Sequence, residues 1–129
     1  MGACISHRLR HPNAYKLTEK RFIPKNIETR LLPPFVAPIT HGRVVKVYDG
    51  DTITIAAYLP YKESCLYKFS VRINGIDCPE MRSSGPSEKK IAVLARDTLS
   101  RKIMGEIVEL VDVKTEKYGR LLATVMHNN

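Results

Sequence analysis

The sequence predicts a mainly β domain with one helix, a five-stranded OB-fold barrel in which the helix lies between strands three and four. Three alternating apolar segments between residues 43 and 76 indicate the first strands. A segment with helical periodicity follows them, and two further β-branched segments come after it. Three strands, one helix and two strands follow one another in this way in an OB barrel. A chain of 129 residues can bury one core of that size.

The first three strands are expected at residues 43–48, 52–58 and 66–76. Asp49-Gly50 separates the first two and is a strong hairpin-turn signal. The third strand alternates regularly, which predicts one buried face and one polar face. The expected buried side chains are Tyr67, Phe69, Val71 and Ile73, and the expected polar ones are Lys68, Ser70 and Arg72.

The helix is expected to begin at Gly85-Pro86, because proline suits the first helical position, and to end at Gly105. Strands at residues 107–113 and 120–126, joined by a turn at 114–119, complete the barrel. Helical spacing predicts one apolar face. Its members are Ile91, Leu94, Ala95, Thr98, Leu99 and Ile103.

Residues 1–38 are predicted to be a basic, proline-containing tail, and residues 39–129 the barrel domain. The tail shows no sustained periodicity. If residues 20–40 cover part of the barrel, their apolar side chains should be buried against it. Those side chains are Ile23, Ile27, Leu31, Leu32, Phe35 and Val36.

The first six residues fit the pattern for N-myristoylation, with Gly2 as the acceptor and Cys4 as a natural second acylation site. Basic residues between Arg8 and Arg30 would add attraction to an acidic membrane. Since the N-terminus has no hydrophobic signal core, we expect an intracellular protein, attached to a membrane if Gly2 is acylated. A chance match of so short a pattern is the alternative.

The formal net charge of +8, from 21 Lys and Arg against 13 Asp and Glu, favours a polyanionic partner, nucleic acid first and acidic membrane second. Solubility alone would also account for this charge. Cys4, Cys65 and Cys78 have no zinc-site spacing, and their odd number favours a reducing compartment. No apolar run is long enough to span a bilayer.

Acidic residues gather in two short segments, Asp49 with Asp51 and Asp77 with Glu80. Hard cations such as Ca²⁺ prefer carboxylate and carbonyl oxygens, and Asp51 and Asp77 at the ends of neighbouring strands could share one ion. Either segment alone could be only a turn or a strand end. Both together, in a basic protein with suitably placed arginines, favour a site.

Arg72 and Arg120 provide those arginines. A guanidinium offers a planar, permanently charged fork that matches phosphate oxygens. Two such groups beside a divalent cation can stabilise the charge of a phosphoryl-transfer transition state. The alternative is that both side chains simply face water.

The segments VYDGDT, VRINGIDCPE and EKYGR resemble the three signature blocks of the staphylococcal nuclease (thermonuclease-like) family, in the same order, over about Gly42–Met126. The resemblance implies a calcium-dependent nuclease that cleaves single-stranded DNA or RNA, and we expect a monomer. It implies that Asp51 and Asp77 bind Ca²⁺ with their carboxylates and Cys78 with its backbone carbonyl. Asp49 would lie near the metal.

The resemblance also implies the groups that act on the substrate. Glu80 matches the carboxylate assigned as general base. Arg72 and Arg120 match the two phosphate-binding arginines, and Lys117 and Tyr118 match residues that contact the bound nucleotide.

Two departures from the family pattern are expected to matter. The loop between Glu80 and Gly85 is several residues shorter, and the sequence stops at Asn129, so the usual C-terminal helices are expected to be missing. A catalytically weak or inactive nucleic-acid-binding OB module is therefore the main alternative. The retained acids and arginines favour the enzyme over it. A membrane-attached interaction protein is a third hypothesis, which acylation of Gly2 would favour.

Overall fold

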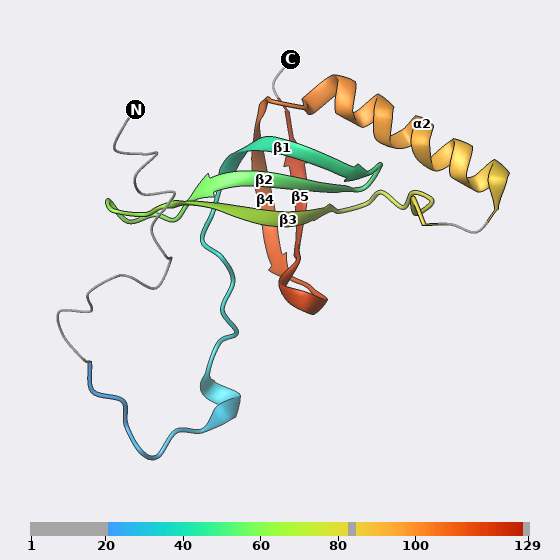
Figure 1. Ribbon diagram of the computed structural model, residues 1–129. Coiled ribbons are helices and arrows are strands. Elements are labelled where there is room, and N and C mark those ends of the chain that lie inside the picture. The colour runs from blue at the N-terminus through green and yellow to red at the C-terminus, as the bar shows by residue number, and fades with distance from the viewer. Residues whose placement is uncertain (1–20, 83–84, 128–129) are drawn as a thin grey trace.

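The computed structural model describes residues 21–82 and 85–127. Figure 1 shows five strands, one long helix and two short 3-10 turns. In chain order these elements are η1 (Thr29–Leu31), β1 (His41–Asp49), β2 (Thr52–Tyr58), β3 (Leu66–Ile73), α2 (Pro86–Ile103), β4 (Ile107–Thr115), η2 (Lys117–Gly119) and β5 (Leu121–Met126). None of the described helices combines the length and the hydrophobicity needed to cross a bilayer.

The strands form a closed barrel in the order β1-β2-β3-β5-β4. All neighbouring pairs are antiparallel except β3 and β5, which are parallel. Figure 1 shows β1, β2 and β3 running across β4 and β5, with α2 at one end of the barrel. The predicted mainly β barrel, with its helix between the third and fourth strands, is confirmed.

The core is made by the inward faces of the strands, and its fully buried side chains include Val44, Ile53, Ile55, Val71 and Val108. In β3 the predicted alternation is confirmed in part: Val71 and Ile73 are buried and Lys68 and Ser70 are exposed, whereas Tyr67, Phe69 and Arg72 are half-buried. β-branched side chains suit this pleated, half-buried surface.

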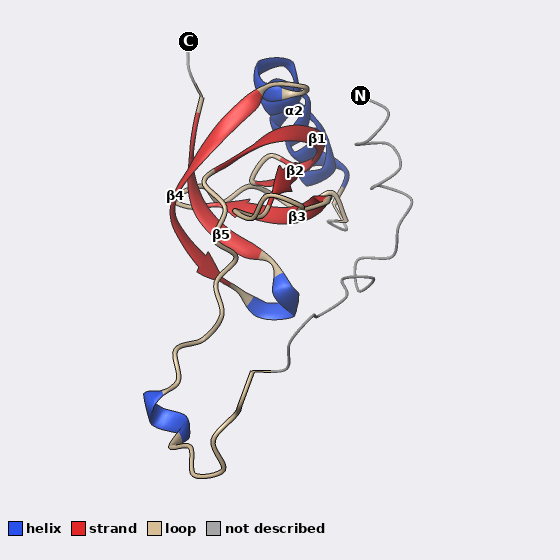
Figure 2. Cartoon of the chain, turned by 90° about the vertical axis from the view of Figure 1, so that its left-hand side faces the viewer, coloured by secondary structure: helices blue, strands red, loops and turns tan. Residues whose placement is uncertain are grey.

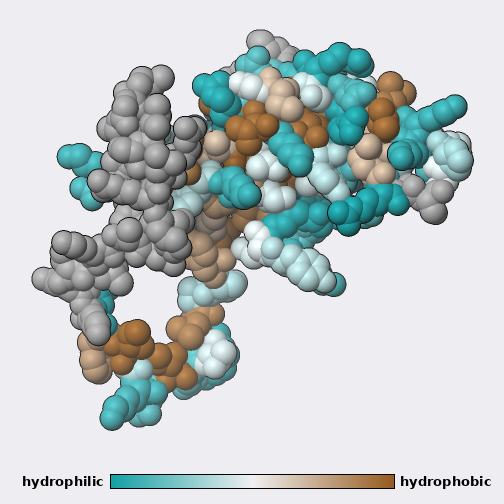
Figure 3. Space-filling model, in the orientation of Figure 1, coloured by the Kyte–Doolittle hydropathy of each residue, from teal (hydrophilic) through white to brown (hydrophobic). Residues whose placement is uncertain are grey.

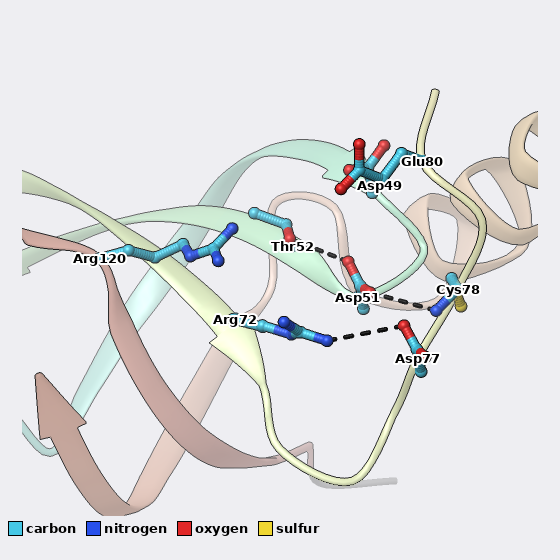
Figure 4. A pocket seen from close by; sticks show the side chains of 8 residues that line it. All are labelled: Asp49, Asp51, Thr52, Arg72, Asp77, Cys78, Glu80 and Arg120. Carbon is cyan, nitrogen blue, oxygen red and sulfur yellow. Dashed lines mark hydrogen bonds and ion pairs between the residues drawn. The ribbon is translucent and has the colours of Figure 1, made fainter. Parts of the chain in front are cut away.

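The third strand ends at Ile73, three residues earlier than the sequence predicted. The amide of Asn74 still donates to the carbonyl of Ala123 at 2.8 Å, but Gly75 follows with a φ of +80°. Glycine adopts this left-handed conformation without steric cost, so the chain turns there. The turn sends the acidic segment from Ile76 to Glu80 back toward the β1–β2 hairpin (Figure 4).

The helix begins at Pro86 and ends at Ile103, and Gly105 follows with a φ of +78°, as the sequence indicated. The predicted apolar face is partly wrong, because Ile91 and Leu94 are 55% and 62% exposed while Ala92 is fully buried. The helix meets the barrel through small residues. Ala95 lies so close to Gly50 that a Cβ added at Gly50 would be 2.7 Å from the Ala95 Cβ. Such close approach leaves little room for larger side chains between them.

The expectation that residues 20–40 cover the barrel with their apolar side chains is wrong for most of them. Ile23, Leu31, Leu32 and Phe35 are 57–76% exposed and Ile27 is 44% exposed, whereas Val36 is half-buried. Figures 1 and 2 show this segment looping away from the barrel, and Figure 3 shows hydrophobic surface on it.

Contact with the barrel begins at the end of this segment. The Thr115 hydroxyl donates to the Phe35 carbonyl at 3.0 Å, and Ala37 and Ile39 are buried in the core, at 8% and 4% exposure. The Leu110 amide donates to the Thr40 carbonyl at 2.8 Å, which holds the chain beside β4. Within residues 21–40, the part that packs on the barrel is therefore short.

Ile39→Ala is expected to lower the free energy of unfolding by about 2–5 kcal/mol, because it removes a buried side chain and leaves a cavity. Phe35→Ala is the matched control, since Phe35 is 76% exposed and its loss should change stability by no more than about 0.5 kcal/mol. Urea denaturation of both variants measures the difference. Equal effects would contradict the packing of Ile39 in the core.

Candidate active site

A polar cavity of about 160 Å³ opens where β1, β2 and β3 approach the acidic loop that follows β3. Figure 4 shows the side chains around it. They are Asp49, Asp51, Thr52, Arg72, Asp77, Cys78, Glu80 and Arg120. Seven of these eight residues are site residues that the sequence singled out. The structure thus brings together groups that lie up to 71 positions apart (from Asp49 to Arg120).

Strand pairing explains this convergence. Thr52 at the start of β2 pairs with Arg72 near the end of β3, and Arg72 pairs with Leu122 in β5. Arg120 therefore lies two residues before a direct neighbour of Arg72. The Ile73 amide donates to the Asp51 carbonyl at 2.7 Å, which fixes the β1–β2 turn beside β3.

Asp49 and Asp51 are buried, at 6% and 7% exposure, and their carboxylates hold the surrounding loops. Asp51 accepts hydrogen bonds from the Thr52 hydroxyl at 2.9 Å and from the Cys78 amide at 3.2 Å. Asp49 accepts one from the Met81 amide at 3.1 Å. Both acids thereby connect the β1–β2 turn to the loop after β3.

Asp77 is placed differently, because its side chain is 93% exposed and faces the Arg72 guanidinium at 3.6 Å. Beside it, burial raises the pKa of the Cys78 thiol above its ordinary value, and the negative charges of Asp51, Asp77 and Asp49 raise it further. The thiol consequently stays protonated at neutral pH.

The oxygen-rich donor set suits a hard cation such as Ca²⁺. Buried carboxylates are costly without a compensating charge, and a bound cation would provide it. In residues 21–82 and 85–127, however, no three His, Cys, Asp or Glu side chains are close enough to form a ready-made metal site. Asp51 and Asp49 lie in the cavity wall, whereas Asp77 points to Arg72 (Figure 4).

The two arginines enter the cavity from β3 and from the start of β5, and Glu116 connects them. Its carboxylate accepts a hydrogen bond from the Arg120 Nε at 2.7 Å and lies 3.9 Å from the Arg72 Nη1. Sequence reasoning did not select Glu116. The sequence could have indicated it, because Glu116 lies four residues before Arg120 within the EKYGR segment.

Glu80 lines the same cavity as Asp49 (Figure 4). Lys117 and Tyr118 lie in η2, directly before Arg120, and are not among the residues that line the cavity. Tyr118 is fully exposed and has a φ of +64°, an uncommon conformation for a residue with a side chain. Gly2 and Cys4 lie outside the described residues.

The fold and the cavity define a class of protein, an OB-type barrel with acids and two arginines gathered at one end of its strands. Residues 70–129 match the family described as "Staphylococcal nuclease homologue", which confirms the resemblance seen in the sequence. The matched range contains Arg72, Asp77, Glu80 and Arg120. It does not contain the VYDGDT segment with Asp49 and Asp51, whose assignment depends on the sequence pattern.

A curated relative is described as a "Probable endonuclease" of Schizosaccharomyces pombe. It is 36% identical to this chain over 58 residues, which are 45% of this chain and 25% of that protein. The alignment with this chain thus spans about a quarter of the relative's length.

Proposed function

We propose that this chain is a nuclease that hydrolyses phosphodiester bonds of single-stranded DNA or RNA, acting as a monomer inside the cell. The observation that supports this most is the convergence of Arg72 and Arg120 with four carboxylates on one cavity. Guanidinium groups suit phosphate oxygens, and carboxylates suit a cation and a water molecule. The family match and the description of the relative agree with this chemistry.

Each residue has a distinct role in the proposed reaction. Arg72 and Arg120 bind the scissile phosphate and stabilise the charge that develops on its oxygens. Glu80 accepts a proton from the attacking water, so that the new P–O bond forms as the bond to the leaving oxygen breaks. Lys117 and Tyr118 in η2 contact the adjoining nucleotide in this proposal.

We propose Ca²⁺ as the cofactor, held by the carboxylates of Asp51 and Asp77 and the Cys78 carbonyl, with Asp49 nearby. When bound, it would supply positive charge for the phosphate oxygens and lower the pKa of a coordinated water. The donor atoms support this choice because all of them are oxygens.

A nucleic-acid-binding module without catalysis is the second candidate. Two observations favour it: the acids do not form a ready-made metal site in the described ranges, and Tyr118 is fully exposed for stacking on a base. The presence of Glu80 in the same cavity as both arginines favours the enzyme.

Incubation of the purified chain with denatured DNA and with RNA decides between the two candidates. Cleavage that appears with Ca²⁺ and disappears with chelator would support the proposed nuclease. Tight binding without cleavage at any Ca²⁺ concentration would favour the binding module. Full-rate cleavage in chelator would contradict the calcium assignment.

We also propose that the N-terminus attaches the protein to a membrane through acylation of Gly2, with Cys4 as a second site. The projecting segment supports attachment, because it carries exposed apolar side chains such as Phe22 and Leu31 together with the basic residues Arg21 and Lys25. Such a segment would add apolar and electrostatic attraction to an acidic surface.

In a eukaryotic cell we expect the full chain to fractionate with membranes and Gly2→Ala to move it to the soluble fraction. One acyl chain alone binds only marginally, so Cys4→Ser should have an intermediate effect. High salt should weaken the remaining attraction. A parent chain found entirely in the soluble fraction would mean that the acylation pattern is a coincidence.

A further inference from the structure

One carboxylate connects the two arginines of the candidate active site. The Glu116 Oε2 is 2.7 Å from the Arg120 Nε, and the Glu116 Oε1 is 3.9 Å from the Arg72 Nη1. The Glu116 side chain is only 25% exposed, so water screens these interactions less than on an open surface. Each carboxylate oxygen thus faces a different guanidinium.

Glu116 itself is held by the barrel. Its amide donates to the Arg120 carbonyl at 2.6 Å, and the preceding Thr115 pairs with Leu121 at the end of the β4–β5 ladder. The main chain of Glu116 is therefore fixed by backbone hydrogen bonds, and the carboxylate is held by its hydrogen bond to Arg120.

Glu116 approaches the arginines from outside the cavity that Asp49, Asp51 and Glu80 line. It lines a neighbouring pocket with Arg72, Asp77 and Leu122, and it does not line the cavity that contains Asp49, Asp51 and Glu80. Its contact with Arg120 uses Nε. The two terminal nitrogens of Arg120, which form the other edge of the guanidinium, can then be directed to a phosphate in the cavity.

We propose that Glu116 is a positioning residue that holds Arg72 and Arg120 at the spacing needed for both to bind one phosphate. This inference rests on the proposed nuclease function. Two guanidinium groups aimed at one small cavity repel each other, and the negative charge between them offsets that repulsion. The arginines are thereby arranged before the substrate arrives, which is the condition for effective transition-state stabilisation.

Glu116→Gln keeps the size and one acceptor atom but removes the charge. We expect kcat to fall by about ten- to a hundredfold, because small misplacements of charge-stabilising groups are costly. The affinity for a single-stranded oligonucleotide, measured in chelator, should stay the same or increase, because the site has lost a negative charge. Glu116→Asp, which restores the charge on a shorter side chain, should recover part of kcat.

The experiment measures kcat, KM, oligonucleotide Kd and Tm for the parent, Glu116→Gln, Glu116→Asp and Glu109→Gln. Glu109 is an exposed residue at the far end of β4, so its variant makes the same charge change away from the arginines. Lower kcat with an unchanged or smaller Kd and an unchanged Tm, in Glu116→Gln and not in Glu109→Gln, would support the inference. An unchanged kcat, an equal loss in Glu109→Gln, or a parallel collapse of Tm would overturn it. A parent chain that cleaves no substrate would instead overturn the proposed function.

Discussion

Asp51→Asn is expected to lower the rate of cleavage by about a hundredfold or more. Losses of this size are typical when a group that stabilises transition-state charge is removed. Asp51 is 7% exposed, and its two oxygens accept hydrogen bonds from Thr52 and Cys78. An asparagine has no charge for a cation, and its NH₂ would face one of these two donors. The variant should therefore lose calcium affinity and some stability at once, the latter by about 1–3 kcal/mol for an unsatisfied buried group.

Calcium titration separates these two effects. A ligand that binds only the folded chain raises Tm, so Ca²⁺ should raise the Tm of the parent and not that of Asp51→Asn. Asp112→Asn is the matched control: Asp112 is exposed and has a φ of +54°, a conformation that asparagine tolerates. If Ca²⁺ raises the Tm of Asp51→Asn as much as that of the parent, Asp51 is not a ligand.

Glu80→Gln is expected to lower kcat by about 10²–10⁴-fold while the affinity for a single-stranded oligonucleotide stays unchanged. The side chain is exposed on the cavity wall, so an amide of the same size fits there without a packing penalty. An amide cannot accept a proton from water at neutral pH. Only the chemical step should therefore change.

Single-turnover cleavage measures this step directly, and Glu106→Gln serves as the control because Glu106 is exposed between α2 and β4. If Glu80→Gln cleaves as fast as the parent, another carboxylate of the cavity must be the base. Asp49 would then be the first to examine, since it lines the same cavity as Glu80. A simultaneous loss of oligonucleotide affinity would indicate that Glu80 positions the substrate.

The barrel could be predicted because strand signals are local. Alternation in β3, the Asp49-Gly50 turn and the glycine after α2 each depend on neighbouring residues. The order of elements then left few possible topologies. The end of β3 was placed too late because apolar residues continue as far as Ile76, whereas the chain turns at Gly75, which has a φ of +80°.

The buried face of α2 and the path of residues 21–40 depended on packing between residues that are far apart in the sequence. Ala95 meets Gly50 in the β1–β2 turn, so the helix buries small residues and leaves Ile91 and Leu94 exposed. Helical periodicity shows which residues share a face, but it does not show how closely the partner approaches. Likewise the composition of the segment from Ile23 to Leu32 is apolar enough to cover a core, but the structure leaves these side chains exposed.

The sequence by itself determined the barrel, its helix and most groups of the candidate site, because period-2 and helical patterns, turn residues and three short motifs are all local. Only the tertiary structure decided how those groups face one another. It directed Asp77 to Arg72, buried Asp49 and Asp51, and placed Glu116 between the arginines. The physical reason is that these relations depend on strand register and on which loops meet at one end of the barrel, and both are set by contacts between residues far apart in the chain.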